Sequence, residues 1–232
     1  MQRAKLFERI LALGARANGG DAGLVPEIVI GPKQTIDTLP LPKSYKDAVT
    51  GPYRKYWIRA VAEELANLRN YKVWRKEPLP KDAQPIRGKF VWKWKGDENN
   101  YLLKAKARFT LQGCCQVKYI HYKKTYAPVA YATTLRVALK LGVDLDYCID
   151  VTDLKAAYLT AFLEPDLTLF MEPPPGVEVE RGFGLRLIRA LYGSMQGAQR
   201  LDVLKHKVLE SLGFIRMSSE TSVYYTPLSS DL

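Results

Sequence analysis

Two lysine- and arginine-rich segments of this 232-residue chain have the residue types and the spacing to bind phosphate groups. From Ile86 to Lys95, and again from Tyr101 to Gln112, apolar side chains alternate with basic ones. A period of two places successive side chains on opposite faces of an extended strand. The basic residues of the two segments are Arg87, Lys89, Lys93, Lys95, Lys104, Lys106 and Arg108. No acidic residue is interleaved with them, so the pattern predicts one apolar face and one basic face that attracts anions.

Turn-forming residues at 96–100 separate the two segments, which predicts a β-hairpin. Like charges that face each other across two strands repel, at a cost of roughly 0.2–1 kcal/mol for each pair. We therefore expect an anion to occupy the basic face, with nucleic-acid or nucleotide phosphates bound by Lys89, Lys93, Lys95 and Lys104. A solvated face without a ligand is the alternative.

The overall charge agrees with a polyanionic partner. Lysine and arginine number 35 against 24 aspartates and glutamates, a formal net charge of +11. Such a field attracts phosphates before any specific contact forms, although many basic proteins bind no nucleic acid. With 47% apolar residues the chain is long enough to bury a core, as one ordinary domain or two small ones.

The cysteines and histidines do not have the spacing of a structural zinc site. Cys114 and Cys115 are adjacent, Cys148 stands alone, and neither His121 nor His206 lies beside a cluster of metal ligands. We expect reduced thiols. No apolar run approaches the roughly 18 residues of a membrane span, so we also expect a soluble protein without a membrane partner. We interpret the basic, amphipathic residues 1–18 as the start of a gene model rather than a targeting peptide.

Hydrophobic periodicity, together with residues that end helices and strands, predicts the remaining elements. A linker is expected over residues 19–45, where Gly, Pro and Thr are frequent, and globular structure is expected to begin near Lys43. Predicted helices are Tyr53–Asn70, a segment capped by Thr133 or Thr134 that runs to about Leu141, and Gln196–Leu212 closed by Gly213. Predicted strands are Tyr147–Val151, Leu167–Met171, Arg186–Ile188 and Ser222–Thr226. This mixture indicates an α/β or α+β layer structure.

A series of short motifs carries a family resemblance. The motifs are Pro42–Ala48, Lys89–Lys93, Lys106–Arg108, Thr125–Val129, Leu135–Arg136, Asp153–Leu159, Met171–Gly176 and Leu191–Gly193 followed by Gln196. In this order, from about residue 42 to 226, they make the chain resemble the reverse transcriptase domain of copia-type (Ty1/copia) retrotransposons. The resemblance implies an α+β fold with the fingers and a partial palm of a right-hand polymerase over residues 43–232. Residues 1–42 would then be an N-terminal extension and linker.

The resemblance also implies a reaction and its partners. In nucleotidyl transfer, a primer 3′-hydroxyl attacks the α-phosphate of a dNTP between two Mg²⁺ ions that aspartates hold. The partners would be an RNA template, a DNA primer, dNTPs and the remainder of a Pol polyprotein. The location would be a cytoplasmic virus-like particle or the nucleus.

Site residues follow from the same resemblance. Asp153 is expected to be the catalytic metal ligand, because Mg²⁺ prefers hard oxygen donors, with the main-chain carbonyl of Leu154 beside it. Tyr158 lies five positions later, where the superfamily places the aromatic residue that excludes a 2′-hydroxyl. Alternatives stay open: Asp150 as the metal ligand, Asp153 as a helix N-cap, and Tyr158 as an ordinary core residue.

Further nucleotide contacts are implied for Lys106, Arg108 and Gln196. Lys106 and Arg108 correspond to finger residues that reach the triphosphate or the template backbone, the arginine with a two-pronged donor and the lysine with a point charge. Gln196 would lie near the incoming nucleotide, with a plain helix N-terminus as its alternative. The residues Gly197–Leu201 after it depart from the family pattern.

One departure bears on activity. The family has an aromatic residue, a variable residue and two aspartates soon after the segment matched by Ser222–Thr226, and this sequence reaches Leu232 without them. One carboxylate does not hold two Mg²⁺ ions for in-line transfer. We therefore expect a C-terminally truncated fragment that is inactive alone. A non-catalytic nucleic-acid-binding relic, or a module co-opted by its host, is the alternative.

Overall fold

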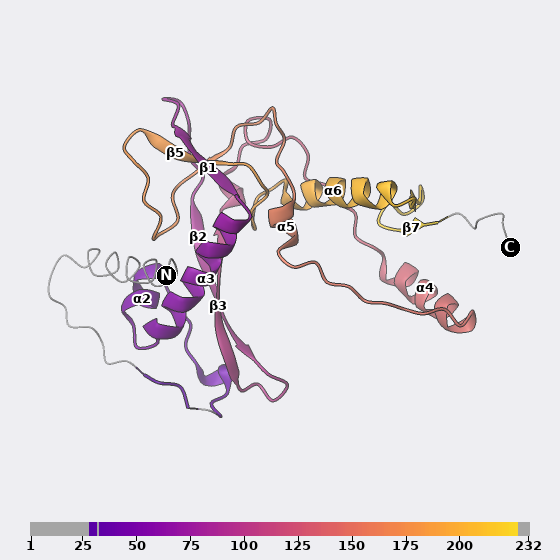
Figure 1. Ribbon diagram of the computed structural model, residues 1–232, viewed down its shortest axis with the longest axis horizontal. Coiled ribbons are helices and arrows are strands. Elements are labelled where there is room, and N and C mark those ends of the chain that lie inside the picture. Colours follow the sequence, from indigo (N-terminus) through magenta and orange to yellow (C-terminus); the bar gives the residue numbers. More distant parts are fainter. Residues whose placement is uncertain (1–27, 32, 227–232) are drawn as a thin grey trace.

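The computed structural model describes residues 28–31 and 33–226, and the amphipathic residues 1–18 lie outside this part. Helices and strands are mixed along the chain, as the sequence predicted, in two regions that Figure 1 shows side by side. The first region holds η1 (Ile36–Thr38), α2 (Tyr45–Thr50), α3 (Arg54–Asn70), β1 (Trp74–Pro78), β2 (Gly88–Gly96), β3 (Leu102–Leu111), η2 (Gly113–Cys115), β4 (Phe170–Met171) and β5 (Phe183–Leu187). The second holds α4 (Ala132–Asp144), α6 (Gly197–Ser211), β6 (Ile215–Arg216) and β7 (Tyr224–Tyr225), and the short α5 (Ala157–Thr160) lies between them.

The predicted hairpin is confirmed as the antiparallel pair β2–β3. Its register places Lys93 opposite Lys106 and Lys95 opposite Lys104, so like charges do face each other on one side. The other side carries six apolar residues in three cross-strand pairs. These are Phe90 with Phe109, Trp92 with Ala107, and Trp94 with Ala105.

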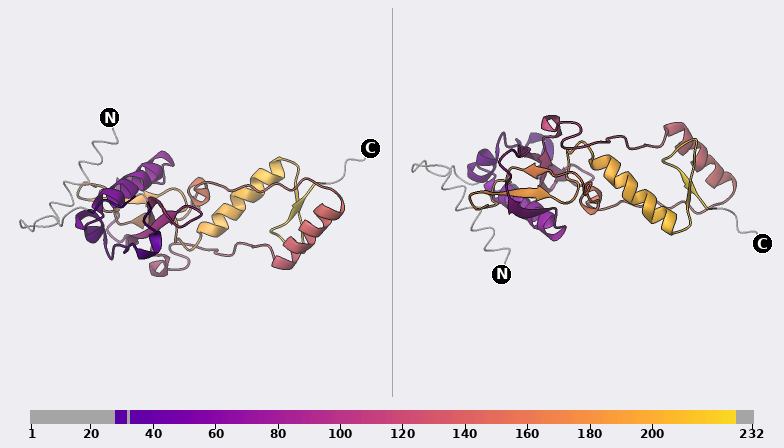
Figure 2. Two further views of the ribbon diagram at one scale, coloured as in Figure 1. Left: turned by 90° about the horizontal axis from the view of Figure 1, so that it is seen from below. Right: turned by 90° about the horizontal axis from the view of Figure 1, so that it is seen from above.

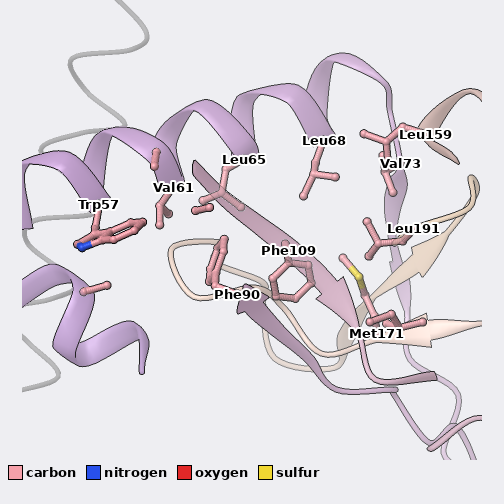
Figure 3. Packing of buried hydrophobic residues seen from close by; sticks show 14 of the residues in the cluster. Trp57, Val61, Leu65, Leu68, Val73, Phe90, Phe109, Leu159, Met171 and Leu191 are labelled. Carbon is pink, nitrogen blue, oxygen red and sulfur yellow. The ribbon is translucent and has the colours of Figure 1, made fainter. Parts of the chain in front are cut away.

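Helix α3 covers the apolar side of the hairpin and confirms the predicted helix. Its buried residues Trp57, Val61, Leu65 and Leu68 recur at three- and four-residue intervals, which places them on one helix face. Figure 3 shows this row above Phe90 and Phe109. Burial of these side chains supplies the main stabilising free energy of the region, about 1.5–3 kcal/mol for each large one.

A second sheet continues this core in the strand order β1–β5–β4. β5 pairs with β1 and with β4, antiparallel in both cases, and brings Leu185 and Leu187 to the core. The amide of Ile86, just before β2, donates to the carbonyl of Phe170 on β4 at 2.8 Å, and the carbonyl of Ile86 accepts from the amide of Glu172 at 3.0 Å, which ties the two sheets together. The strand predictions at 167–171 and 186–188 therefore hold, with shifted ends.

The expected linker before residue 43 is partly wrong. Ile30 and Leu39 are buried, and the amide of Ile30 donates to the hydroxyl of Tyr56 at 2.9 Å. The indole nitrogen of Trp94 donates to the carbonyl of Pro40 at 3.0 Å. Sequence reasoning missed these contacts because the short apolar stretches 28–30 and 39–41, among Gly, Pro and Thr, produce no periodic signal.

Helix α4 forms where it was predicted, but its expected cap is wrong. The N-cap residue is Tyr131, and neither threonine caps the helix with its side chain. Instead the Glu220 carboxylate accepts hydrogen bonds from the Tyr131 amide at 2.8 Å and from the Thr134 hydroxyl. Glu220 is distant from α4 in the sequence, so no local pattern predicts this interaction.

The predicted strand Tyr147–Val151 is also wrong. Residues 147–154 have no regular structure, and Val151 is 96% exposed. A strand requires a neighbour for its backbone donors and acceptors, and none of the described strands pairs with this segment. The prediction at 196–212 holds as α6, with Gly213 in the left-handed conformation at φ +84°. Within the described residues, no helix is long and apolar enough to cross a membrane.

One polar contact fastens α3 to the hairpin. Glu64 is 9% exposed, and its Oε1 accepts a hydrogen bond from the backbone amide of Phe109 at 3.0 Å. This amide points away from β2, so the carboxylate takes the place of a neighbouring strand. Burial raises the pKa of Glu64, while the Phe109 bond and the charges of Arg108 and Lys106 oppose the rise.

Glu64→Gln should therefore become more stable relative to the wild type as the pH rises. A folded-state pKa above the unfolded value means that the folded chain holds the proton longer, so the wild type loses stability as Glu64 ionises. An amide oxygen can still accept the Phe109 bond without a buried charge. Urea unfolding of both proteins from about pH 4 to pH 8 measures the difference.

Glu64→Ala is the matched control, because it leaves the Phe109 amide without its acceptor. We expect it to be about 1–3 kcal/mol less stable than Glu64→Gln at every pH, because neither variant titrates at this position. If Glu64→Gln loses as much as Glu64→Ala at pH 8, the ionised charge is stabilising and the account of Glu64 is wrong.

Candidate functional site

The basic face of the hairpin consists of exposed side chains on β2 and β3. Its members are Lys89, Lys93, Lys95, Lys104, Lys106 and Arg108, all exposed. Partial burial lowers the pKa of Lys106, and the nearby charges of Arg108 and Lys95 lower it further. Arg87 differs from this set because it forms an ion pair with Glu172 at 3.3 Å. The face concentrates positive charge that a bound anion would neutralise.

Arg108 connects this face to two tyrosines. Its guanidinium carbon lies 4.3 Å from the centre of the Tyr192 ring, within the range of a cation–π contact. The Tyr192 ring in turn meets the Tyr158 ring edge to face, with centroids 5.5 Å apart. Burial raises the pKa of Tyr192, so its hydroxyl stays protonated at neutral pH. β3, the turn after β5, and α5 thus each contribute one residue, Arg108, Tyr192 and Tyr158, to what we call the tyrosine cluster.

Close backbone contacts hold this cluster together. The amide of Leu111 donates to the carbonyl of Tyr192 at 2.7 Å. Gly193 has φ +80°, and a Cβ there would lie 2.3 Å from the carbonyl oxygen of Leu111. A Cβ on Gly113 would lie 2.2 Å from the carbonyl oxygen of Gly193. Only glycines allow the end of β3 to approach the turn this closely.

Tyr158 is positioned by the start of α6. It is half-buried on α5, whereas its neighbour Leu159 is fully buried. A Cβ on Gly197, the first residue of α6, would lie 3.2 Å from the Tyr158 ring. The ring therefore packs against a helix end that has no side chain, and part of it remains accessible beside Tyr192.

Asp153 and Leu154 lie in the exposed segment without regular structure, as does Asp150. Helix α5 begins at Ala157 with Ala156 as its N-cap residue, so the N-cap alternative for Asp153 is wrong. Across residues 28–31 and 33–226, no three His, Cys, Asp or Glu side chains gather where they could hold a metal ion. The described residues therefore do not fit a pair of Mg²⁺ ions by themselves.

Gln196 is completely buried, and its amide is engaged on both sides. Its Oε1 accepts from the Gln116 side chain at 3.0 Å, and its Nε2 donates to the carbonyl of His121 at 2.9 Å. Gln116 also accepts the amide of Met195 at 2.8 Å. Gln196 is the N-cap residue of α6, but its side chain does not cap the helix. A nucleotide contact from Gln196 stays a prediction that would require this network to open.

Sequence reasoning did not single out Gln116, His121 or Tyr192 as members of this region. Tyr192 lies within the Leu191–Gly193 motif, so the motif was the available signal. Gln116 and His121 form hydrogen bonds with Gln196 although they are 80 and 75 positions away in the sequence, so no local pattern predicts them.

A family model described as reverse transcriptase (RNA-dependent DNA polymerase) matches residues 71–231. The chain belongs to this reverse transcriptase family. The matched range includes the hairpin, the tyrosine cluster and Asp153. The family implies dependence on a divalent metal in general.

Curated relatives identify the branch of the family as copia-type. The Pol polyprotein of transposon TNT 1-94 from Nicotiana tabacum is 29% identical over 81% of this chain, and that of transposon RE1 from Arabidopsis thaliana is 26% identical over 92%. The Ty1-ER2 Gag-Pol polyprotein of Saccharomyces cerevisiae is 28% identical over 74%. The chain spans only 10–14% of the length of these relatives. No solved structure matches this reverse transcriptase chain significantly.

The backbone junction at Gly193 can be tested with a matched pair of variants. Gly193→Ala and Gly182→Ala both place a Cβ at positive φ, at a cost of about 1–2 kcal/mol. Only Gly193→Ala also meets the Leu111 carbonyl, since the space around Gly182 is open. We expect Gly193→Ala to lose a further ~1–3 kcal/mol in urea unfolding. Equal losses would show that the close approach of β3 to the turn does not matter.

Proposed function

We propose that this chain supplies the phosphate-facing part of an RNA-directed DNA polymerase site, as part of a copia-type Pol polyprotein. Residues 43–232 would form fingers and a partial palm, with residues 1–42 as an extension. The substrates would be an RNA template, a DNA primer and dNTPs.

The observation that carries the proposal is the contact of the basic face with the tyrosine cluster. Arg108 was predicted to contact the nucleotide and Tyr158 to exclude a 2′-hydroxyl, and the two lie 50 positions apart in the sequence. The structure brings both of them to Tyr192. A triphosphate on Lys106 and Arg108 would then have its sugar directed toward the accessible part of Tyr158.

Each residue has a distinct task in this proposal. Arg108 offers a planar fork to two phosphate oxygens, and its stacking on Tyr192 fixes the plane of that fork. Lys106 adds a point charge, and the neighbouring cations that lower its pKa favour an anion at this position. Lys89, Lys93, Lys95 and Lys104 extend the positive surface along the hairpin, where a template backbone could follow it.

The metal-dependent step is left incomplete by the described residues. Asp153, assisted by the Leu154 carbonyl, would supply one ligand for Mg²⁺, which would stabilise the attacking and leaving oxygens of the transfer when bound. Further carboxylates would have to come from residues that the structure does not describe or from elsewhere in the polyprotein.

The purified chain should therefore not extend a primer. Incubation with poly(rA)/oligo(dT), Mg²⁺ and dTTP should give no product longer than the primer on a denaturing gel. Intact reverse transcriptase in parallel shows that the substrate is competent. Extension that disappears in Asp153→Asn would overturn the claim that one carboxylate is insufficient.

Binding of the same hybrid should depend on the basic face. Replacement of Lys104, Lys106 and Arg108 by Ala should weaken binding and reduce the slope of log K against log salt by up to about 0.9 for each lost phosphate contact. Asp153→Asn should leave the slope unchanged. Fluorescence anisotropy at several salt concentrations measures both.

A matched control removes the same charge elsewhere. Lys55, Arg69 and Lys81 are exposed and lie outside the basic face, so their combined replacement by Ala changes net charge equally. We expect a much smaller loss of slope from this control. Equal losses in the two triple variants would show that net charge, and not the hairpin face, governs binding.

A further inference from the structure

Cys114 and Cys115 form an exposed pair of thiols on η2, directly after β3. Their Sγ atoms lie 4.0 Å apart. Adjacent side chains on an extended strand would point to opposite faces. The tight turn of η2 instead presents both sulfurs on the same side.

The turn that carries the thiols is fixed on both flanks. The amide of Cys115 donates to the carbonyl of Gln112 at 3.0 Å, and that of Gln116 donates to Gly113 at 2.9 Å. Before the pair, Gly113 packs against the Gly193 carbonyl. After it, the buried Gln116 side chain bonds to Met195 and Gln196. The positions of the two sulfurs are therefore set by the same contacts that hold the tyrosine cluster.

We propose that Cys114 and Cys115 form a binding site for a thiophilic metal or metalloid that takes both sulfurs at once. Two thiolates bound at about 2.3 Å to one tetrahedral centre lie about 3.8 Å apart. The observed separation is close to this value, so little rearrangement is required. Two thiolates at this distance repel each other, and a bound cation relieves the repulsion.

The site differs from a structural zinc site. Among the described residues no third His, Cys, Asp or Glu joins the pair to complete a metal-binding group. The protein would supply two ligands, and solvent or the rest of the ligand would fill the other positions. An exchangeable ligand at the surface fits this arrangement better than a metal that holds the fold together.

Phenylarsine oxide is a suitable probe because trivalent arsenic binds two thiols. Each thiol gives up its proton, two arsenic–sulfur bonds form, and the oxygen of the oxide leaves as water. The oxidation states of arsenic and sulfur do not change, so no other reactant is required.

Intact mass measurement of the full chain with one equivalent of phenylarsine oxide tests the site. We expect one adduct that withstands excess monothiol and is removed by a dithiol. Cys148→Ser should keep this adduct, whereas Cys114→Ser and Cys115→Ser should each bind at least tenfold more weakly. Urea unfolding should first show that the three variants are folded.

The contribution of the turn has its own test. In a denaturing concentration of urea, the wild type should lose affinity for phenylarsine oxide, because η2 no longer holds the sulfurs together. A monothiol-resistant adduct in Cys114→Ser or Cys115→Ser would overturn the assignment of the pair. Undiminished affinity of the unfolded chain would overturn the role of the turn.

Discussion

The contact between the end of β3 and the Leu191–Gly193 turn is the constraint on which the candidate site depends. It joins two backbones through the Leu111 amide and the Tyr192 carbonyl, and glycines at 113 and 193 remove the side chains that would separate them. Backbone hydrogen bonds of this kind fix direction as well as distance. Arg108 lies only three residues before Leu111, so the same contact also brings its guanidinium to the Tyr192 ring.

Three buried polar side chains satisfy backbone groups in the elements that this junction joins. Glu64 accepts from the outward amide of Phe109, Gln116 accepts from the amide of Met195, and Gln196 donates to the carbonyl of His121. A buried donor without a partner costs about 1–3 kcal/mol, so loss of any of these side chains would weaken the junction rather than a remote part of the fold. Gln116 and Gln196 each accept one hydrogen bond and donate another, so the pair links the start of α6 to the segment after β3.

The sequence predicted those features that depend on local periodicity. The β2–β3 alternation and the buried face of α3 could be read directly. Buried residues recur every two positions along the strands and every three to four positions along the helix. The failures share a different cause. The strand at 147–151 requires a pairing partner, the cap of α4 comes from Glu220, and burial of Ile30 requires Tyr56. Each is a contact across a long stretch of chain, which spacing does not encode.

The two halves of the proposed site differ in how firmly they are held. The phosphate-facing half rests on a packed core, whereas Asp153 follows a segment whose apolar residues are exposed, including Val143 at 72% and Val151 at 96%. Figure 2 shows α4 and its extended connections standing apart from the core of the first region. Exposed apolar side chains add almost nothing to stability until they are covered. The described residues therefore supply little free energy to hold Asp153 in place, and a metal-binding role for Asp153, as proposed, would require further contacts.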